Sequence, residues 1–216
     1  MKRSFPGFLV VALFVMSIFS GNSFAETATK WNLDKSHSSI NFKIWHLMTP
    51  VYGKFDDYNV DLNFDPENLA ASSIKVSIKT ASINTGWEPR DNHLKTSDWF
   101  DVDIFPLMSF TSSQITSLGD GNYVAKGKLK IRNVEKDVEL PFKVLGIKQI
   151  PEEMRKAFGG NDEVASFEIA NFQINRKDYK VGTGTSTPGE AAMTYRDVVG
   201  SSVTLNIVIE ANRKTM

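Results

Sequence analysis

Apolar and polar residues alternate with a period of two along most of this chain, and this pattern predicts β-strands rather than helices. The clearest run is YNVDLNF at 58–64, where apolar and polar residues alternate without a break. The other predicted strands are 40–45, 74–79, one beginning at 108, 123–131, 138–144, 164–174 and 203–209. Gly119-Asp120-Gly121-Asn122 is typical of a hairpin turn, because Gly and Asn accept positive φ angles.

Two stretches interrupt the alternation and are the candidates for helix. Arg90–Phe110 mixes charged residues with large apolar ones, and Gln149–Gly160 combines a Pro-Glu-Glu start with a Gly-Gly end. Thr183–Ala192 is rich in Gly, Thr, Ser and Pro and is predicted to be a flexible loop. About eight strands with short turns and no linker predict one all-β domain, either a closed antiparallel barrel or a sandwich.

The N-terminus has the three parts of a secretory signal peptide. Met1-Lys2-Arg3 is basic, Phe8–Phe19 is apolar except for Ser17, and Ser23-Phe24-Ala25 places small residues at the −3 and −1 positions. An uncleaved anchor would need roughly 20 apolar residues. We therefore expect cleavage after Ala25, which leaves residues 26–216 as an exported domain. The signal is of a bacterial type and predicts the periplasm, and no later segment predicts stable membrane insertion.

Composition excludes several classes of function. Removing Lys2 and Arg3 from 25 basic residues leaves 23 against 25 acidic ones, and this slightly negative balance argues against a nucleic-acid partner. The chain has no cysteine, so thiol nucleophiles, thiolate metal sites and redox pairs are absent. The domain must therefore be held together by its core, and at this size a core can bury enough surface.

Metal binding and catalysis find little support in the sequence. His37, His46 and His93 lack metal-ligand spacing and an acidic partner motif, so no metal is predicted. Ser38 follows His37 directly, but adjacent strand residues point to opposite faces and do not form a nucleophile–base pair. Several aspartates cluster near Asp98, but Ser97-Asp98 is more typical of a helix N-cap. We predict that the protein is not an enzyme and needs no cofactor.

Ordered matches along nearly the whole mature chain resemble one known family. The matching segments are Trp31–Asp34, His37-Ser38, Phe42, His46-Leu47, Tyr52–Phe55, Arg90–Asp101, Phe105-Pro106, Phe110–Ser112, Gly127–Leu129, Val138–Leu140 and Ile174–Tyr179. The most specific is Arg90–Asp101, RDNHLKTSDWFD. The chain resembles the YceI-like family, periplasmic lipocalin-like proteins that bind polyisoprenoids.

The resemblance implies an all-β fold, an eight-stranded antiparallel lipocalin-like barrel with short helices in one connection. It implies a carrier or store that encloses a long isoprenoid lipid, a polyprenyl pyrophosphate or an isoprenoid quinone, in an apolar tunnel. The alternatives are a stress-related structural or partner protein with a filled core, and a small lipid-modifying enzyme. A homodimer is left open, as is the choice between a lined tunnel and a filled core for the many phenylalanines.

The alternation and the resemblance together name the expected ligand-binding residues. The tunnel lining is expected from Phe42, Ile44, Val60, Leu62, Val76, Phe110, Leu129, Leu140, Phe142 and Leu205. The head group is expected near Arg90, Asp91, His93 and Arg176, with His46 or His93 as a donor to a quinone. The alternative for Arg90 and Asp91 is a local ion pair that only fixes the loop. Leu94, Trp99, Phe100 and Phe105 are expected to form a lid over the apolar interior.

Overall fold

A computed structural model describes residues 30–183 and 198–215. The predicted signal peptide, 1–25, and almost all of the predicted loop at 183–192 lie outside the described residues. The strands are β1 (Lys30–His46), β2 (Thr49–Phe55), β3 (Tyr58–Asn63), β4 (Ser73–Lys79), β5 (Ile83–Asn84), β6 (Leu107–Gly119), β7 (Asn122–Ile131), β8 (Val134–Gln149), β9 (Glu163–Asn175) and β10 (Val199–Arg213).

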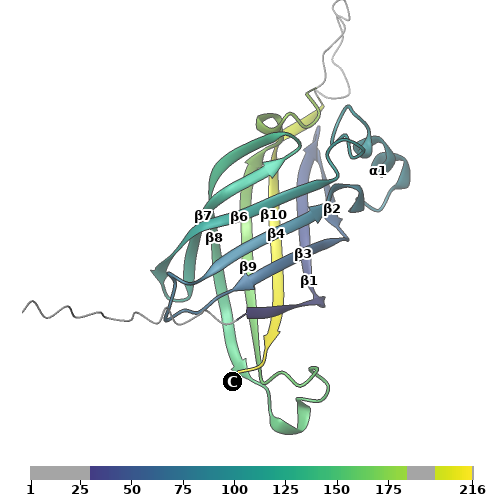
Figure 1. Ribbon diagram of the computed structural model, residues 1–216. Helices are drawn as coiled ribbons and strands as arrows, with labels where there is room; N and C mark the ends of the chain where they lie inside the picture. The colour runs from purple at the N-terminus through teal and green to yellow at the C-terminus, as the bar shows by residue number, and fades with distance from the viewer. Residues whose placement is uncertain (1–29, 184–197, 216) are drawn as a thin grey trace, which may run out of the picture.

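Eight of these strands close into a ring (Figure 1). The order is β1-β10-β9-β8-β7-β6-β4-β3, and β3 returns to β1, with every neighbouring pair antiparallel. The two short strands β2 and β5 extend the sheet from the far half of β1. The predicted eight-stranded antiparallel barrel is therefore confirmed.

The short helices lie in the connections. Helix α1 (Glu88–Lys95) lies between β5 and β6, where the sequence predicted it, and a 3-10 turn, η1 (Thr80–Ser82), precedes it. Two further 3-10 turns, η2 (Glu152–Met154) and η3 (Arg176–Tyr179), follow β8 and β9. The predicted N-cap at Ser97-Asp98 is wrong, because α1 begins after Trp87 and has already ended there.

The strand predictions succeed where alternation is regular. In the β7–β8 hairpin, Lys126 Nζ lies 2.9 Å from a Glu139 oxygen and Lys128 Nζ lies 2.9 Å from an Asp137 oxygen, as the charge pattern predicted. Such exposed cross-strand pairs contribute little to stability, because water screens the charges. Strand β2 was not predicted because it contains Pro50 and Gly53, which interrupt the alternation.

An aromatic cluster closes the end of the barrel at which β3 ends and β7 begins, and we call this end the lower end. Phe64, which is 0% exposed, contacts the rings of Tyr123, Phe142 and Phe167 edge-on at centroid distances of 5.2, 6.0 and 5.4 Å. The Trp31 Nε1 donates to the Phe64 carbonyl at 2.8 Å. The cluster seals this end with apolar surface and satisfies the one buried indole donor that it contains.

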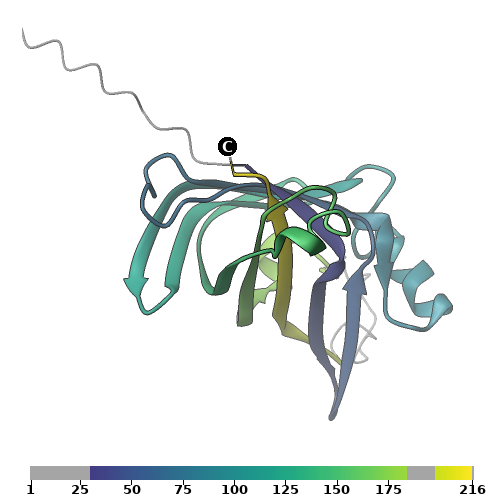
Figure 2. The ribbon, with the colours of Figure 1, turned by 90° about the horizontal axis from the view of Figure 1, so that it is seen from below.

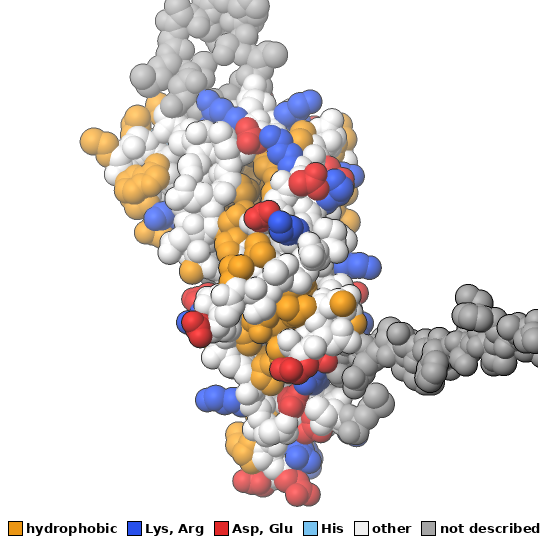
Figure 3. All heavy atoms as spheres, turned by 90° about the vertical axis from the view of Figure 1, so that its left-hand side faces the viewer, with side chains coloured by type: hydrophobic (Ala, Val, Ile, Leu, Met, Phe, Trp, Pro, Cys, Tyr) orange, Lys and Arg blue, Asp and Glu red, His pale blue; other side chains and the backbone are white. Residues whose placement is uncertain are grey.

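Strands β8 and β9 pair along only part of their length. Their register runs from Lys143↔Glu168 to Gln149↔Glu163, whereas 134–142 pairs with β7 and 169–175 lies beside β10. A bulge bends β9 at this point: Asn171 has a φ of 55° and its N–H donates to the Asn206 Oδ1 at 3.0 Å. The wall is therefore split between the upper halves of β8 and β9, and Figure 3 shows apolar side chains along a hollow on this side.

Candidate functional site

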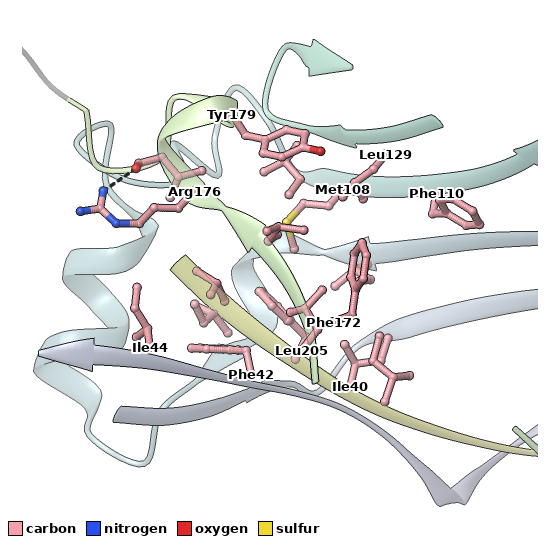
Figure 4. Close-up of a pocket in the computed structure, with 18 of the residues that line it drawn as sticks. Ile40, Phe42, Ile44, Met108, Phe110, Leu129, Phe172, Arg176, Tyr179 and Leu205 are labelled. Carbon is pink, nitrogen blue, oxygen red and sulfur yellow. Dashed lines mark hydrogen bonds between the residues drawn. The ribbon is translucent and has the colours of Figure 1, made fainter. Parts of the chain in front are cut away.

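The barrel encloses a cavity of about 640 Å³ with an apolar lining (Figure 4). It runs from His46, Thr49 and Trp87 at the upper end to Phe167 and Ile209 near the aromatic cluster. In Figure 4, Met108 and Leu129 face Leu205 and Phe172 across the empty space. A cavity of this size is within the range of small-molecule sites. It does not fit the alternative interpretation of a structural protein with a filled core.

Nearly all of the residues predicted to bind ligand lie on the cavity wall. These are Phe42, Ile44, His46, Val60, Leu62, Val76, Arg90, His93, Leu94, Trp99, Phe100, Phe110, Leu129, Leu140, Phe142, Arg176 and Leu205. The inward-facing register predicted from alternation is therefore the one that the strands adopt. Whether these residues contact a ligand remains a prediction.

Asp91 and Phe105 lie away from the cavity wall, contrary to the sequence prediction. The Asp91 carboxylate accepts hydrogen bonds from Thr85, from its N–H at 2.9 Å and from its hydroxyl at 2.5 Å, so it fixes the loop before α1. The Phe105 ring lies beneath the Arg132 guanidinium, 5.2 Å from it, and the Phe105 carbonyl accepts from the Thr80 hydroxyl at 3.0 Å. Both residues brace the connection that covers the upper end.

Sequence reasoning missed lining residues on the split side of the wall. Ile169 and Ile174 of β9 line the cavity, and so do Val203 and Ile207 of β10. Phe172 of β9 also lines it, and it is one of the phenylalanines for which the sequence left a tunnel lining open. The alternation in β10 was visible and could have identified Val203 and Ile207. The bulge at Asn171 shifts the inward face of β9 from odd to even positions, and no local signal in the sequence announced that shift.

Polar groups of the lining gather at the upper end around Trp99. The guanidinium of Arg176 lies 5.0 Å from the Trp99 ring centroid, and the His93 ring meets Trp99 edge-on at 6.1 Å. Arg176 is buried and donates hydrogen bonds to four backbone carbonyls, those of Val181, Gly182, Val199 and Gly200, at 2.7–2.9 Å. These bonds tie η3 to the start of β10.

Trp99 itself has an unsatisfied donor. Its side chain is 3% exposed and lines the cavity, yet its Nε1–H has no acceptor among residues 30–183 and 198–215. A buried donor without a partner costs about 1–3 kcal/mol. By contrast, Arg90 at the same end donates from Nε and Nη2 to the Thr85 hydroxyl and carbonyl, at 2.7 and 2.9 Å. Trp99 therefore carries a buried neutral donor at the upper end of the cavity without a partner among the described residues.

A glycine keeps the wall smooth beside Phe42. Gly53 lies directly opposite Phe42 in the β1–β2 pair, and a Cβ atom at Gly53 would overlap the Phe42 ring. The ring therefore lies against the strand instead of crossing the cavity. This is the type of cross-strand contact in which an aromatic ring covers a glycine.

A separate polar cluster lies where β1 meets β10, outside the cavity lining. The His37 Nδ1 lies 3.0 Å from an Asp34 oxygen and 3.5 Å from a Glu210 oxygen, so the fold supplies the acidic partners that the sequence did not show. Hydrogen bonds from Ser36 and His37 lower the pKa of Asp34 to about 2. Among the described residues, Asp34, His37 and Glu210 bring together the kinds of atoms that can hold a metal ion. The ion pairs of His37 with the two carboxylates account for this arrangement without a metal.

This cluster makes stability depend on pH. The hydrogen bond to Asp34 raises the pKa of His37 above its usual value, so its stabilising contribution is complete below about pH 6.5 and is lost as the pH rises through the raised pKa. We expect the melting temperature of the wild type to fall relative to that of His37→Gln between about pH 6 and pH 9. Thermal unfolding of both proteins across this range measures the difference, and parallel curves would contradict the assignment.

A family model described as the YceI-like domain matches residues 31–211. The chain belongs to the YceI-like family. Among relatives, Protein YceI of Salmonella arizonae is 32% identical over 184 residues, which cover 85% of this chain and 89% of that protein. A UPF0312 protein of Vibrio vulnificus is 31% identical over 154 residues, covering 70% of this chain and 80% of that protein.

Solved structures share the barrel. The YCEI protein of Campylobacter jejuni is 33% identical with a TM-score of 0.62, and the match covers 87% of this chain and 99% of that one. BcnA of Burkholderia cenocepacia gives a TM-score of 0.68 at 24% identity, with coverage of 83% and 99%. A polyisoprenoid binding domain from Saccharophagus degradans gives 0.59 at 14% identity, with coverage of 85% and 98%. Within the described residues, no helix is both long enough and apolar enough to cross a bilayer.

Proposed function

We propose that this YceI-like protein is a periplasmic carrier or store that encloses the tail of an isoprenoid lipid. The observation that carries the proposal is the large cavity, which has apolar walls along its length and polar side chains near one end. Burial of each CH₂-sized unit of a tail contributes about 0.8 kcal/mol, so a long tail needs few polar contacts. The description of the Saccharophagus degradans domain as polyisoprenoid binding supports this class of ligand.

The residues proposed to contact the tail are the predicted ones that line the wall. The aromatic cluster around Phe64 closes the lower end, so the tail is proposed to point toward this end and the head group toward Trp99. This orientation places apolar atoms against apolar walls. It also places the head group beside the side chains that carry hydrogen-bond donors.

A carbonyl head group fits the upper end better than a pyrophosphate. The guanidinium groups of Arg90 and Arg176 are already hydrogen-bonded to protein oxygens, whereas the Trp99 Nε1–H has no acceptor in the described part of the chain. A single neutral donor suits a quinone oxygen, while a pyrophosphate is held best by several charged donors. Of the two ligands expected from the sequence, we therefore favour the isoprenoid quinone.

Native mass spectrometry of protein purified from the periplasm of its own host, followed by organic extraction, tests the proposed function. The expected result is a non-covalent adduct that releases an isoprenoid on extraction. A folded protein that carries no extractable lipid and takes up none from added isoprenoid quinone would overturn the proposal. Protein that has been unfolded, extracted and refolded without lipid provides the ligand-free sample to which the quinone is added.

The variant Trp99→Phe tests the head-group contact. It removes the Nε1–H but keeps an aromatic ring against Arg176, so we expect about a tenfold loss of quinone affinity, in line with one hydrogen bond of about 1.4 kcal/mol. Affinity for a polyprenyl hydrocarbon without a head group should change much less. Fluorescence titration with both ligands measures the contrast, and equal losses for both would assign Trp99 a packing role only.

A further inference from the structure

Large apolar side chains are exposed around the tip of the β1–β2 hairpin. The hairpin patch, as we define it, consists of Trp45, Leu47, Met48, Tyr52 and Trp87, all about half exposed or more. Figure 2 shows the dark blue hairpin projecting away from the barrel, and Figure 3 shows apolar side chains gathered at the upper left, over the same hairpin. Exposed apolar groups gathered in this way mark an interaction surface.

The hairpin turn breaks the usual rules for turn residues. His46 pairs with Thr49, so Leu47 and Met48 form a two-residue turn, and Leu47 has a φ of 50°. Glycine or asparagine is favoured in such a turn, yet the side chains here are 64% and 90% exposed. The Leu47 N–H donates to the Val198 carbonyl at 2.8 Å, which holds the tip in place. Large apolar residues in a turn that favours glycine or asparagine break a local sequence rule, and such exceptions are expected at functional sites.

The two faces of the hairpin lead from the surface into the cavity. Ile44, His46 and Val51 line the cavity, whereas Trp45 and Tyr52 alternate with them and lie on the outer face. Trp87 belongs to both, since it lines the cavity and is 56% exposed. An apolar molecule could thus pass between the patch and the cavity over continuous apolar surface.

We propose that the hairpin patch docks the protein onto a phospholipid bilayer, with Leu47 and Met48 inserted among the lipids. Trp and Tyr are the residues that favour the interface between headgroups and acyl chains, and Lys43 lies opposite Tyr52 on the outer face of the hairpin. The projecting shape also favours a bilayer over a second copy of the chain. A stable two-fold interface needs a self-complementary surface of roughly 800 Å² on each partner. Insertion of a narrow tip into a bilayer has no such requirement, because fluid lipids rearrange around it.

Flotation of the mature protein with vesicles of phosphatidylethanolamine and phosphatidylglycerol tests this docking. The double variant Leu47→Asn with Met48→Gly replaces the tip by a favoured turn, so it should fold at least as well as the wild type. We expect its vesicle-bound fraction to fall at least tenfold. The matched control is Leu118→Asn on β6, where the leucine is also 64% exposed, and this variant should bind vesicles like the wild type.

Three results would overturn the docking proposal. They are a wild type that does not float with vesicles, a double variant that floats equally well, and a wild-type dimer in sedimentation that the double variant loses. The docking goes beyond the proposed function, and lipid extraction from the same samples separates the two. If the protein floats with vesicles through the hairpin patch but never contains extractable lipid, the carrier function alone is overturned. If it contains lipid but does not bind vesicles, the docking alone is overturned.

Discussion

The variant Leu129→Trp is expected to lose nearly all of its bound lipid while remaining folded. Leu129 projects into the cavity from near the end of β7, opposite the wall that carries Leu205 and Phe172 (Figure 4). An indole there would occupy space that the proposed tail needs. Because the indole fills a cavity instead of a packed core, the melting temperature should stay the same or rise.

Quantitative extraction of lipid from equal amounts of purified protein measures this loss, and we expect at least a tenfold reduction. The control is Lys130→Trp, on the same strand and exposed on the outside of the barrel, which should retain wild-type lipid. Wild-type lipid content in a folded Leu129→Trp protein would show that the ligand lies elsewhere. Equal losses in both variants would mean that tryptophan disturbs β7 as a strand.

The variant Phe64→Ala is expected to lose about 3–5 kcal/mol in free energy of unfolding, the usual cost of removing a fully buried phenylalanine. Phe64 contacts three aromatic rings, and its removal leaves a void that they cannot all close. The void would join the cavity, so the surviving folded protein should also accept longer tails. Urea denaturation measures the first effect, and mass spectrometry of bound lipids measures the second.

Phe172→Ala is the matched control for this loss. Phe172 is only half-buried and already borders the empty cavity, so its removal should cost clearly less than that of Phe64. If the two variants lost the same free energy of unfolding, the aromatic cluster would not be the closed base of the barrel that its packing indicates.

The sequence alone predicted most of the barrel because regular alternation reports burial on one face. The run at 58–64 and the hairpin of β7 and β8 show this most clearly, since their inward and outward residues lie where the pattern placed them. The register of the tunnel residues followed from the same pattern. Family resemblance then added the expected class of ligand, which no periodicity could supply.

What could not be predicted depends on contacts between distant segments. His37 obtains its acidic partner Glu210 from the other end of the chain, and Asp91 turns toward Thr85 instead of the cavity. Strand β2 was concealed by Pro50, which the strand tolerates. The unsatisfied donor of Trp99 likewise results from tertiary packing, and the sequence does not show whether the indole N–H of a tryptophan has a hydrogen-bond acceptor.

The partial pairing of β8 with β9 gives the two halves of the barrel different mechanical properties. At the lower end, where β8 pairs with β9 from Lys143 onward, the hydrogen-bonded strands form a closed ring. This ring resists expansion, because a larger circumference would break the hydrogen bonds between two neighbouring strands. Above it no ladder of backbone hydrogen bonds joins β8 to β9 among the described residues, and the edges are held by side-chain contacts with η3, such as that of Lys136 with Asp178. We therefore expect the lower barrel to accept only one narrow chain, such as a single isoprenoid tail, and the upper barrel to accept groups of different widths. A lipid store built in this way would select its ligand by the width of the tail and accept head groups of different sizes.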